Sequence, residues 1–141
     1  MRREMLRAKI HRARVTRAEL GYVGSVSICP DLLRRADIRP FEQVHVLDVD
    51  NGARLVTYAM EGQPGEICLN GAAARLVQVG DLVIIVAYAS YEESELEGFQ
   101  PRIVHVDSHN IALAEHDAKR FATERTYVHV TSAANVDDPD C

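Results

Sequence analysis

The sequence has few of the features that mark membrane-spanning, disulfide-stabilised or metal-binding proteins. It contains no tryptophan and no apolar run near the roughly 18 residues that cross a bilayer. Its three cysteines (Cys29, Cys68 and Cys141) are odd in number and form no CxxC pair, which argues against a disulfide framework or a structural zinc site. The six histidines are scattered, so we also expect no dedicated metal site.

The sequence also lacks a visible secretory signal, because its basic start is not followed by an apolar segment. With the cysteine pattern, this predicts a protein of the reducing cytoplasm that has no membrane partner. A length of 141 residues without a linker or repeat suits one domain over 1–141. The apolar pattern weakens from about residue 107, so we expect a weakly ordered tail over 107–141.

Positive charge is concentrated at one end of the chain. The net charge is −5, yet seven of the 16 lysines and arginines lie in the first 17 positions. Such a basic arm is half of a nucleic-acid-binding signature. The other half is missing, because no aromatic side chain is interleaved with these charges. We therefore favour a solvated strand face and no nucleic-acid partner, and an unprocessed β-barrel that binds nucleic acid stays as an alternative.

Alternating segments separated by turn residues run through most of the chain. Apolar and basic residues alternate over 5–11, which places Lys9 and His11 on the same side of a strand. Asn51-Gly52 between two such segments is the strongest hairpin signal.

Helical signals are few. Pro30 near the start of 30–36 favours a short helix, and a second helix is expected to begin at about Asn70. The other expected strands lie at 21–28, 43–49, 53–60, 67–69, 82–88 and 102–106. Several short strands with frequent turns and little helix predict a small closed β-barrel.

The dipeptide Gly24-Ser25 is compatible with self-cleavage of the chain. A serine hydroxyl that attacks the preceding carbonyl converts the amide into an ester, and elimination then releases the upstream segment as a carboxylate. The dehydroalanine left behind hydrolyses to a pyruvoyl group and ammonia. Glycine at position 24 leaves the carbonyl open to approach and tolerates a distorted backbone. A Gly-Ser turn is common, however, and the two residues alone favour an ordinary turn.

Gly24-Ser25 occurs together with five separated sequence blocks that support its interpretation as a cleavage site. They are Met5 to Ser25 with Lys9, His11 and Tyr22, then Asn51-Gly52-Ala53-Arg54, Thr57-Tyr58-Ala59, Asn70-Gly71-Ala72-Ala73-Ala74, and Gly80-Asp81-Leu82-Val83-Ile84-Ile85. In these blocks the chain closely resembles the pyruvoyl-dependent aspartate 1-decarboxylases. The blocks occur in the same order as in that family and with nearly the same spacing. The resemblance covers about residues 1–106.

The resemblance implies a six-stranded double-ψ β-barrel with short helices, assembled as a homotetramer with its site between subunits. It implies cleavage between Gly24 and Ser25 into residues 1–24 and 25–141, after which Ser25 becomes the covalent pyruvoyl cofactor. A separate maturation factor stays open as a partner. The expected reaction turns L-aspartate into β-alanine and CO2, which supplies pantothenate and coenzyme A. A pyruvoyl decarboxylase acting on another amino acid stays as an alternative.

The resemblance also assigns roles to individual residues. Tyr58 would donate a proton to the substrate after CO2 has left. Thr57 would bond the carbonyl of Gly24 during activation and contact the substrate. The remaining expected substrate-binding residues supply cations, amide donors or a wall of the site, and they are Lys9, His11, Tyr22, Arg54, Asn70, Gly71, Ala72 and Ala73.

One geometric conflict accompanies these assignments. In a regular strand Arg54 and Tyr58 share a face, whereas Thr57 points to the other. All three can serve one site only if the strand is bulged or if two subunits contribute to it. We expect one or both of these arrangements.

Overall fold

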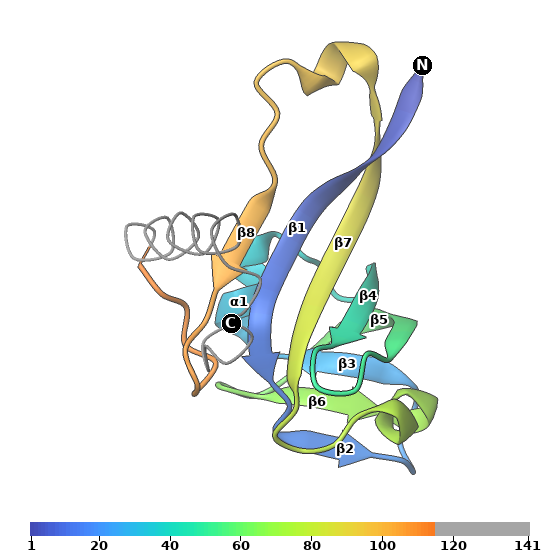
Figure 1. The fold of residues 1–141 in the computed structure, drawn as a ribbon, viewed down its shortest axis with the longest axis vertical. Coiled ribbons are helices and arrows are strands. Elements are labelled where there is room, and N and C mark those ends of the chain that lie inside the picture. Colours follow the sequence, from blue (N-terminus) through green and yellow to red (C-terminus); the bar gives the residue numbers. More distant parts are fainter. Residues whose placement is uncertain (115–141) are drawn as a thin grey trace, which may run out of the picture.

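Among the described residues the fold is mainly β, with eight strands and three short helices (Figure 1). The computed structural model describes residues 1–114. The strands are β1 (Arg2–Arg14), β2 (Arg17–Glu19), β3 (Ser25–Ile28), β4 (Gln43–Asp48), β5 (Arg54–Glu61), β6 (Ile67–Asn70), β7 (Leu82–Glu92) and β8 (Arg102–His105). The helices are α1 (Pro30–Ala36) and the 3-10 helices η1 (Gly71–Leu76) and η2 (Glu93–Leu96). The predicted mainly β class with short helices is confirmed.

The strands pair in a circuit, in the order β2-β6-β3-β5-β4-β7-β1-β8. Only Val15 and Thr16 separate β1 from β2, and the Thr16 amide donates to the Ile67 carbonyl at 2.8 Å. The pairing therefore returns to the stretch of chain from which it started, with β1 and β2 acting as one bent strand. Counted in this way, the circuit has the six members expected of the barrel: β1/β2, β6, β3, β5, β4 and β7.

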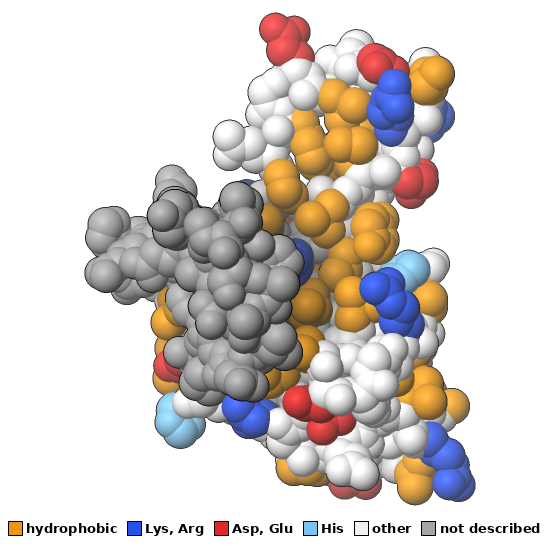
Figure 2. Space-filling model, viewed as in Figure 1, with side chains coloured by type: hydrophobic (Ala, Val, Ile, Leu, Met, Phe, Trp, Pro, Cys, Tyr) orange, Lys and Arg blue, Asp and Glu red, His pale blue; other side chains and the backbone are white. Residues whose placement is uncertain are grey.

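The long strand β1 shows the predicted alternation. Ala8 and Ile10 are fully buried, whereas Lys9 and His11 lie half-buried on the other side. Toward the N-terminus, β1 and β7 leave the barrel as a two-stranded arm (Figure 1). Hydrophobic side chains gather along this arm in Figure 2, and Tyr88 of β7 is 48% exposed. The arm therefore carries apolar surface outside the core.

The predicted hairpin and the first predicted helix both form. β4 and β5 pair antiparallel around the Asn51-Gly52 turn, in which Gly52 takes a φ of +77°. α1 covers the expected 30–36, and its Asp31 carboxylate accepts hydrogen bonds from two arginines one turn later in the helix. Both elements follow from local signals in the sequence.

One hydrophobic core lies inside the circuit of strands. Its largest fully buried members are Ile10, Val15, Val26, Ile28, Leu32, Val44, Val46, Ile67, Leu69, Val83 and Ile85. The last described residues are tied to the strands by Asn110, which is 2% exposed. The Asn110 amide bonds both the N–H and the C=O of Arg14, at 2.7 Å and 2.9 Å. The rest of the expected tail, residues 115–141, lies outside the described residues.

Candidate active site

Ser25 is the first residue of β3, and its side chain is buried at 4% exposure. The loop before it is open, since Tyr22 and Val23 are 71% and 74% exposed. The Ser25 hydroxyl donates to the Val23 carbonyl at 3.3 Å. The Gly24–Ser25 peptide therefore joins an exposed loop to a buried strand.

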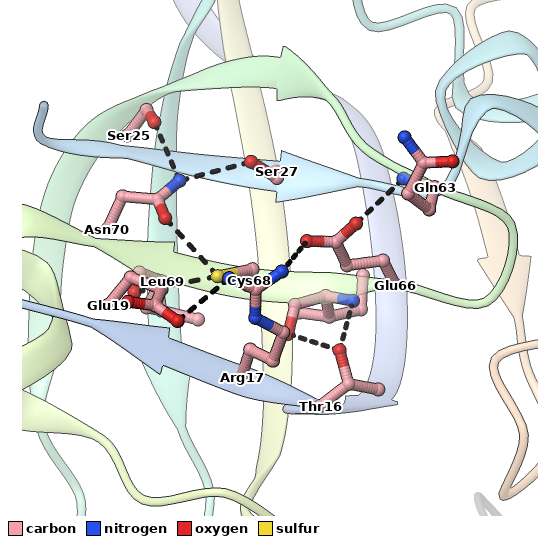
Figure 3. Close-up of polar contacts among 11 residues, drawn as sticks. Thr16, Arg17, Glu19, Ser25, Ser27, Gln63, Glu66, Cys68, Leu69 and Asn70 are labelled. Carbon is pink, nitrogen blue, oxygen red and sulfur yellow. Dashed lines mark hydrogen bonds and ion pairs between the residues drawn. The ribbon is translucent and has the colours of Figure 1, made fainter. Parts of the chain in front are cut away.

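Asn70 holds Ser25 from the neighbouring strand. β3 and β6 pair antiparallel, with Ser25 opposite Asn70. The Asn70 amide nitrogen donates to the hydroxyls of Ser25 at 2.9 Å and Ser27 at 3.0 Å (Figure 3). Its amide oxygen accepts from the Cys68 thiol at 3.2 Å. These four side chains share the face of the sheet that points away from the core, because Val26, Ile67 and Leu69 occupy the core face.

The backbone of Gly71 packs directly against the Gly24–Ser25 segment. A Cβ at position 71 would lie 2.7 Å from the Gly24 Cα and 2.8 Å from both the Gly24 nitrogen and the Tyr22 carbonyl oxygen. Gly71 also has a φ of +63°, which strains any residue with a side chain. Only glycine fits here without moving the segment expected to be cut.

The helix expected to begin at Asn70 is a 3-10 helix, η1. Asn70 precedes it with an extended φ of −112° and makes no side-chain cap, because its amide bonds the two serines instead. Ala73 in η1 is buried, whereas Ala72 is exposed. The predicted helix therefore forms as a 3-10 helix, and its first residue brings the backbone of Gly71 against Gly24.

Strand β5 divides its expected site residues between two faces. Its pairing with β4 is regular from Arg54 to Tyr58, so the expected bulge is not formed in this pairing. Leu55 and Ala59 pack in or against the core, which places Thr57 on the inward face. Arg54 and Tyr58 lie on the outward face with Ser25, which the β3–β5 register places beside Tyr58. Tyr58 also stacks on Phe41, with ring centroids 6.3 Å apart.

Lys9 and His11 lie on a strand that pairs with neither β3 nor β5. They lie on β1, which is separated from β5 by β4 and β7. The His11 ring contacts that of His105 at 5.2 Å. The regular β4–β5 pairing leaves Thr57 on the opposite face of β5 from Arg54 and Tyr58.

Four of the seven basic residues of the arm form ion pairs within the protomer, among them Arg17 with Glu19 at 2.8 Å. Arg2 pairs with Glu92 at 2.9 Å and Arg3 pairs with Glu93 at 3.2 Å. Arg7 pairs with Glu42 and also lies 3.8 Å from the carboxylate of Asp37. These ion pairs support the solvated strand face that the sequence favours for the arm.

Ser27 and Cys68 were not singled out from the sequence, although they complete the contacts around Asn70. A spacing of two residues on paired strands was the available signal, since it places Ser27 beside Ser25 and Cys68 beside Asn70 on one face. That signal depends on the register of β3 and β6, which no local pattern determines.

Comparison with known proteins decides which family the chain is in. The aspartate decarboxylase family model matches residues 1–113. The chain belongs to this family. The aspartate 1-decarboxylase of Campylobacter hominis is 55% identical over 109 residues, which are 77% of this chain and 96% of the relative. That of Campylobacter curvus is 54% identical over 110 residues, 78% of this chain and 96% of the relative.

The contacts at Gly24 and Ser25 lie within the region that the aspartate decarboxylase family model matches. The matched region includes strands β3, β5 and β6 and ends one residue before the last described position. Within residues 1–114 no helix has the length and apolar character needed to cross a membrane.

Proposed function

We propose that this chain is an aspartate 1-decarboxylase that converts L-aspartate to β-alanine and CO2 after cutting itself between Gly24 and Ser25. The observation that carries the proposal is the buried Ser25 hydroxyl, held by Asn70 at 2.9 Å in a chain of the aspartate decarboxylase family. A simple Gly-Ser turn needs no such donor from another strand.

The residues around Ser25 suit the cleavage step. The hydroxyl oxygen bonds to the Gly24 carbonyl carbon as the Gly24–Ser25 C–N bond breaks, and the hydroxyl proton passes to the freed nitrogen. Asn70 holds the hydroxyl in place, and Gly71 fixes the backbone of Gly24 from the other side. A reacting pair held in one geometry gains rate because its rotational entropy is already lost.

A pyruvoyl group at position 25 fits the residues present. It would sit on the outward face of β3, with the Asn70 amide as a hydrogen-bond donor and Tyr58 on the neighbouring strand. When formed, this group supplies a ketone that binds the substrate amine and withdraws electrons from its α-carbon. The Tyr58 hydroxyl would donate the proton that the product requires.

The two carboxylates of aspartate call for cationic partners. Arg54 lies exposed on the same face as Tyr58, and among residues 1–114 it makes no ion pair. A guanidinium binds a carboxylate through two parallel hydrogen bonds, so Arg54 would hold one carboxylate of the substrate. Tyr22, with its exposed ring, would form a wall of the site.

We propose a homotetramer in which Lys9 and His11 reach a site on the neighbouring protomer. Its support is that β1, which carries both residues, pairs with neither β3 nor β5, and that the arm of β1 and β7 offers apolar surface for assembly (Figure 2). Such an enzyme would supply β-alanine for pantothenate and coenzyme A in the cytoplasm. A maturation factor would accelerate the cleavage without changing its chemistry.

The test is to measure CO2 and amine product from L-aspartate and, separately, from L-glutamate. Wild type should form β-alanine from aspartate, and Ser25→Ala should form none. Faster product formation from glutamate would support the alternative of a pyruvoyl decarboxylase that acts on another amino acid. A single uncut chain that forms no product and binds DNA with steep salt dependence would support the nucleic-acid-binding alternative instead.

A further inference from the structure

The thiol of Cys68 contacts the side-chain amide of Asn70. Cys68 precedes Asn70 by two positions on β6, is 2% exposed, and places its Sγ 3.2 Å from the Asn70 amide oxygen (Figure 3). The other acceptor near this thiol, the Leu69 carbonyl, is farther away at 3.9 Å. The amide of Asn70 is therefore the nearer partner of the thiol.

The serines alone cannot decide which way this amide points. A hydroxyl both donates and accepts, so Ser25 and Ser27 can bond either the NH2 or the oxygen of Asn70. A protonated thiol is a donor, and it selects the amide oxygen. Burial raises the pKa of the Cys68 thiol, with Glu66 and Glu19 raising it further against the lowering effect of Arg17. The thiol is therefore kept protonated as a donor.

The orientation of the Asn70 side-chain amide determines whether its NH2 or its oxygen faces the Ser25 hydroxyl oxygen. With the oxygen of Asn70 held by Cys68, the NH2 faces the Ser25 hydroxyl, whose own proton points to the Val23 carbonyl. A donor then lies where negative charge grows as the hydroxyl loses its proton. In the reversed amide an acceptor would face this oxygen and hold its proton.

We propose that Cys68 is a positioning residue for self-cleavage, acting by fixing the Asn70 amide so that its NH2 faces the attacking oxygen of Ser25. This inference rests on the proposed self-cleavage at Gly24-Ser25. The step it assists forms the bond from the Ser25 oxygen to the Gly24 carbonyl carbon and breaks the Gly24–Ser25 C–N bond, with the hydroxyl proton ending on the nitrogen.

The first experiment follows the intact mass of freshly synthesised chains over time under denaturing conditions. Cys68→Val keeps an apolar side chain of similar size without a donor, and we expect it to slow cleavage about tenfold, as for one lost hydrogen bond. Cys68→Ser restores a donor and should return the rate to within about threefold of wild type. Cys29→Ala changes another buried cysteine, outside the contacts around Asn70, and should leave the rate unchanged.

Cleavage of Cys68→Val at the wild-type rate would overturn the inference. Equal slowing of Cys68→Ser and Cys68→Val would overturn it as well, because a purely steric role gives no rescue by a donor. In both cases wild-type cleavage would still support the proposed function, so the two failures are distinguishable.

A second measurement does not require cleavage. In a Ser25→Ala chain labelled with 15N-asparagine, the four asparagine side chains of the sequence give four NH2 signals. Hydrogen exchange of the Asn70 NH2 should be slow with Cys68, faster with Cys68→Val and slow again with Cys68→Ser. Identical exchange in all three would show that Cys68 does not orient the amide.

Discussion

At the scale of single residues, Gly71 is the position at which a small change should have the largest effect. A methyl group there would lie 2.7 Å from the Gly24 Cα, so the chain would have to move the peptide expected to be cut. We predict that Gly71→Ala slows cleavage roughly 100-fold or more, because a shift near 1 Å at a reacting group has that order of effect. The intact-mass time course measures it.

Gly98→Ala is the matched control for this substitution. Gly98 also has a positive φ, +73°, but nothing lies within 4 Å of a Cβ placed on it. Both variants lose about 1 kcal/mol from the backbone conformation, and only Gly71→Ala displaces Gly24. Equal cleavage rates in the two variants would contradict the steric argument.

Substitution of Tyr58 should affect turnover of the substrate but not self-cleavage. Its ring stacks on Phe41, and a phenylalanine at position 58 keeps that contact while removing the hydroxyl. We predict that Tyr58→Phe is cut normally but loses roughly 100-fold or more in kcat for β-alanine formation, the usual size of a proton-donor effect. A fully active Tyr58→Phe enzyme would rule out its role as the acid.

At the scale of elements, the β4–β5 hairpin carries a buried carboxyl that should make stability depend on pH. Asp48 ends β4 at 3% exposure, and its Oδ1 accepts the amides of Asp50 and Asn51 in the turn. Burial, with a further contribution from the neighbouring Asp81, raises the pKa of Asp48 from 3.8 to about 6. The folded chain therefore binds this proton more strongly than the unfolded chain.

The contribution of Asp48 to stability is fully present below about pH 4 and is lost as the pH rises through about 6. Asp48→Asn keeps an acceptor for the turn and removes the charge. At pH 7 the variant should be more stable than wild type by up to ~3 kcal/mol, and the difference should vanish near pH 4. Urea unfolding of both chains across this range measures it, and parallel curves for the two would contradict the assignment.

The elements differ in how far the sequence determines them. The hairpin and α1 were predictable because Asn51-Gly52 and Pro30 act within a few residues. The 3-10 form of η1 was not, because Gly71 adopts its positive φ in close contact with Gly24, far away in the sequence. The contact of Cys68 with Asn70 likewise depends on the register between β3 and β6.

At the scale of the whole molecule, the arrangement of strands places Lys9 and Tyr58 apart. Lys9 lies on β1 and Tyr58 on β5, with β4 and β7 between them in the circuit. If both serve one site, the site combines two protomers. Co-expressing inactive Lys9→Ala and Tyr58→Phe chains should therefore restore activity, to about a quarter of wild type, because a quarter of randomly formed interfaces carry neither substitution.

Activity in the mixed protein no higher than in its parents would place both residues in one protomer. Analytical ultracentrifugation of the same samples must show assembled protein in each case, so that loss of assembly is separated from loss of complementation.

The self-cleavage of Gly24-Ser25 is tested most directly by the intact mass of the purified protein under denaturing conditions. We predict two pieces, residues 1–24 and residues 25–141, the second lacking a free amino group at its N-terminus and matching a pyruvoyl group in place of Ser25. Ser25→Ala should give one chain of 141 residues. A wild-type protein that stays a single chain while it forms β-alanine from L-aspartate would contradict the account.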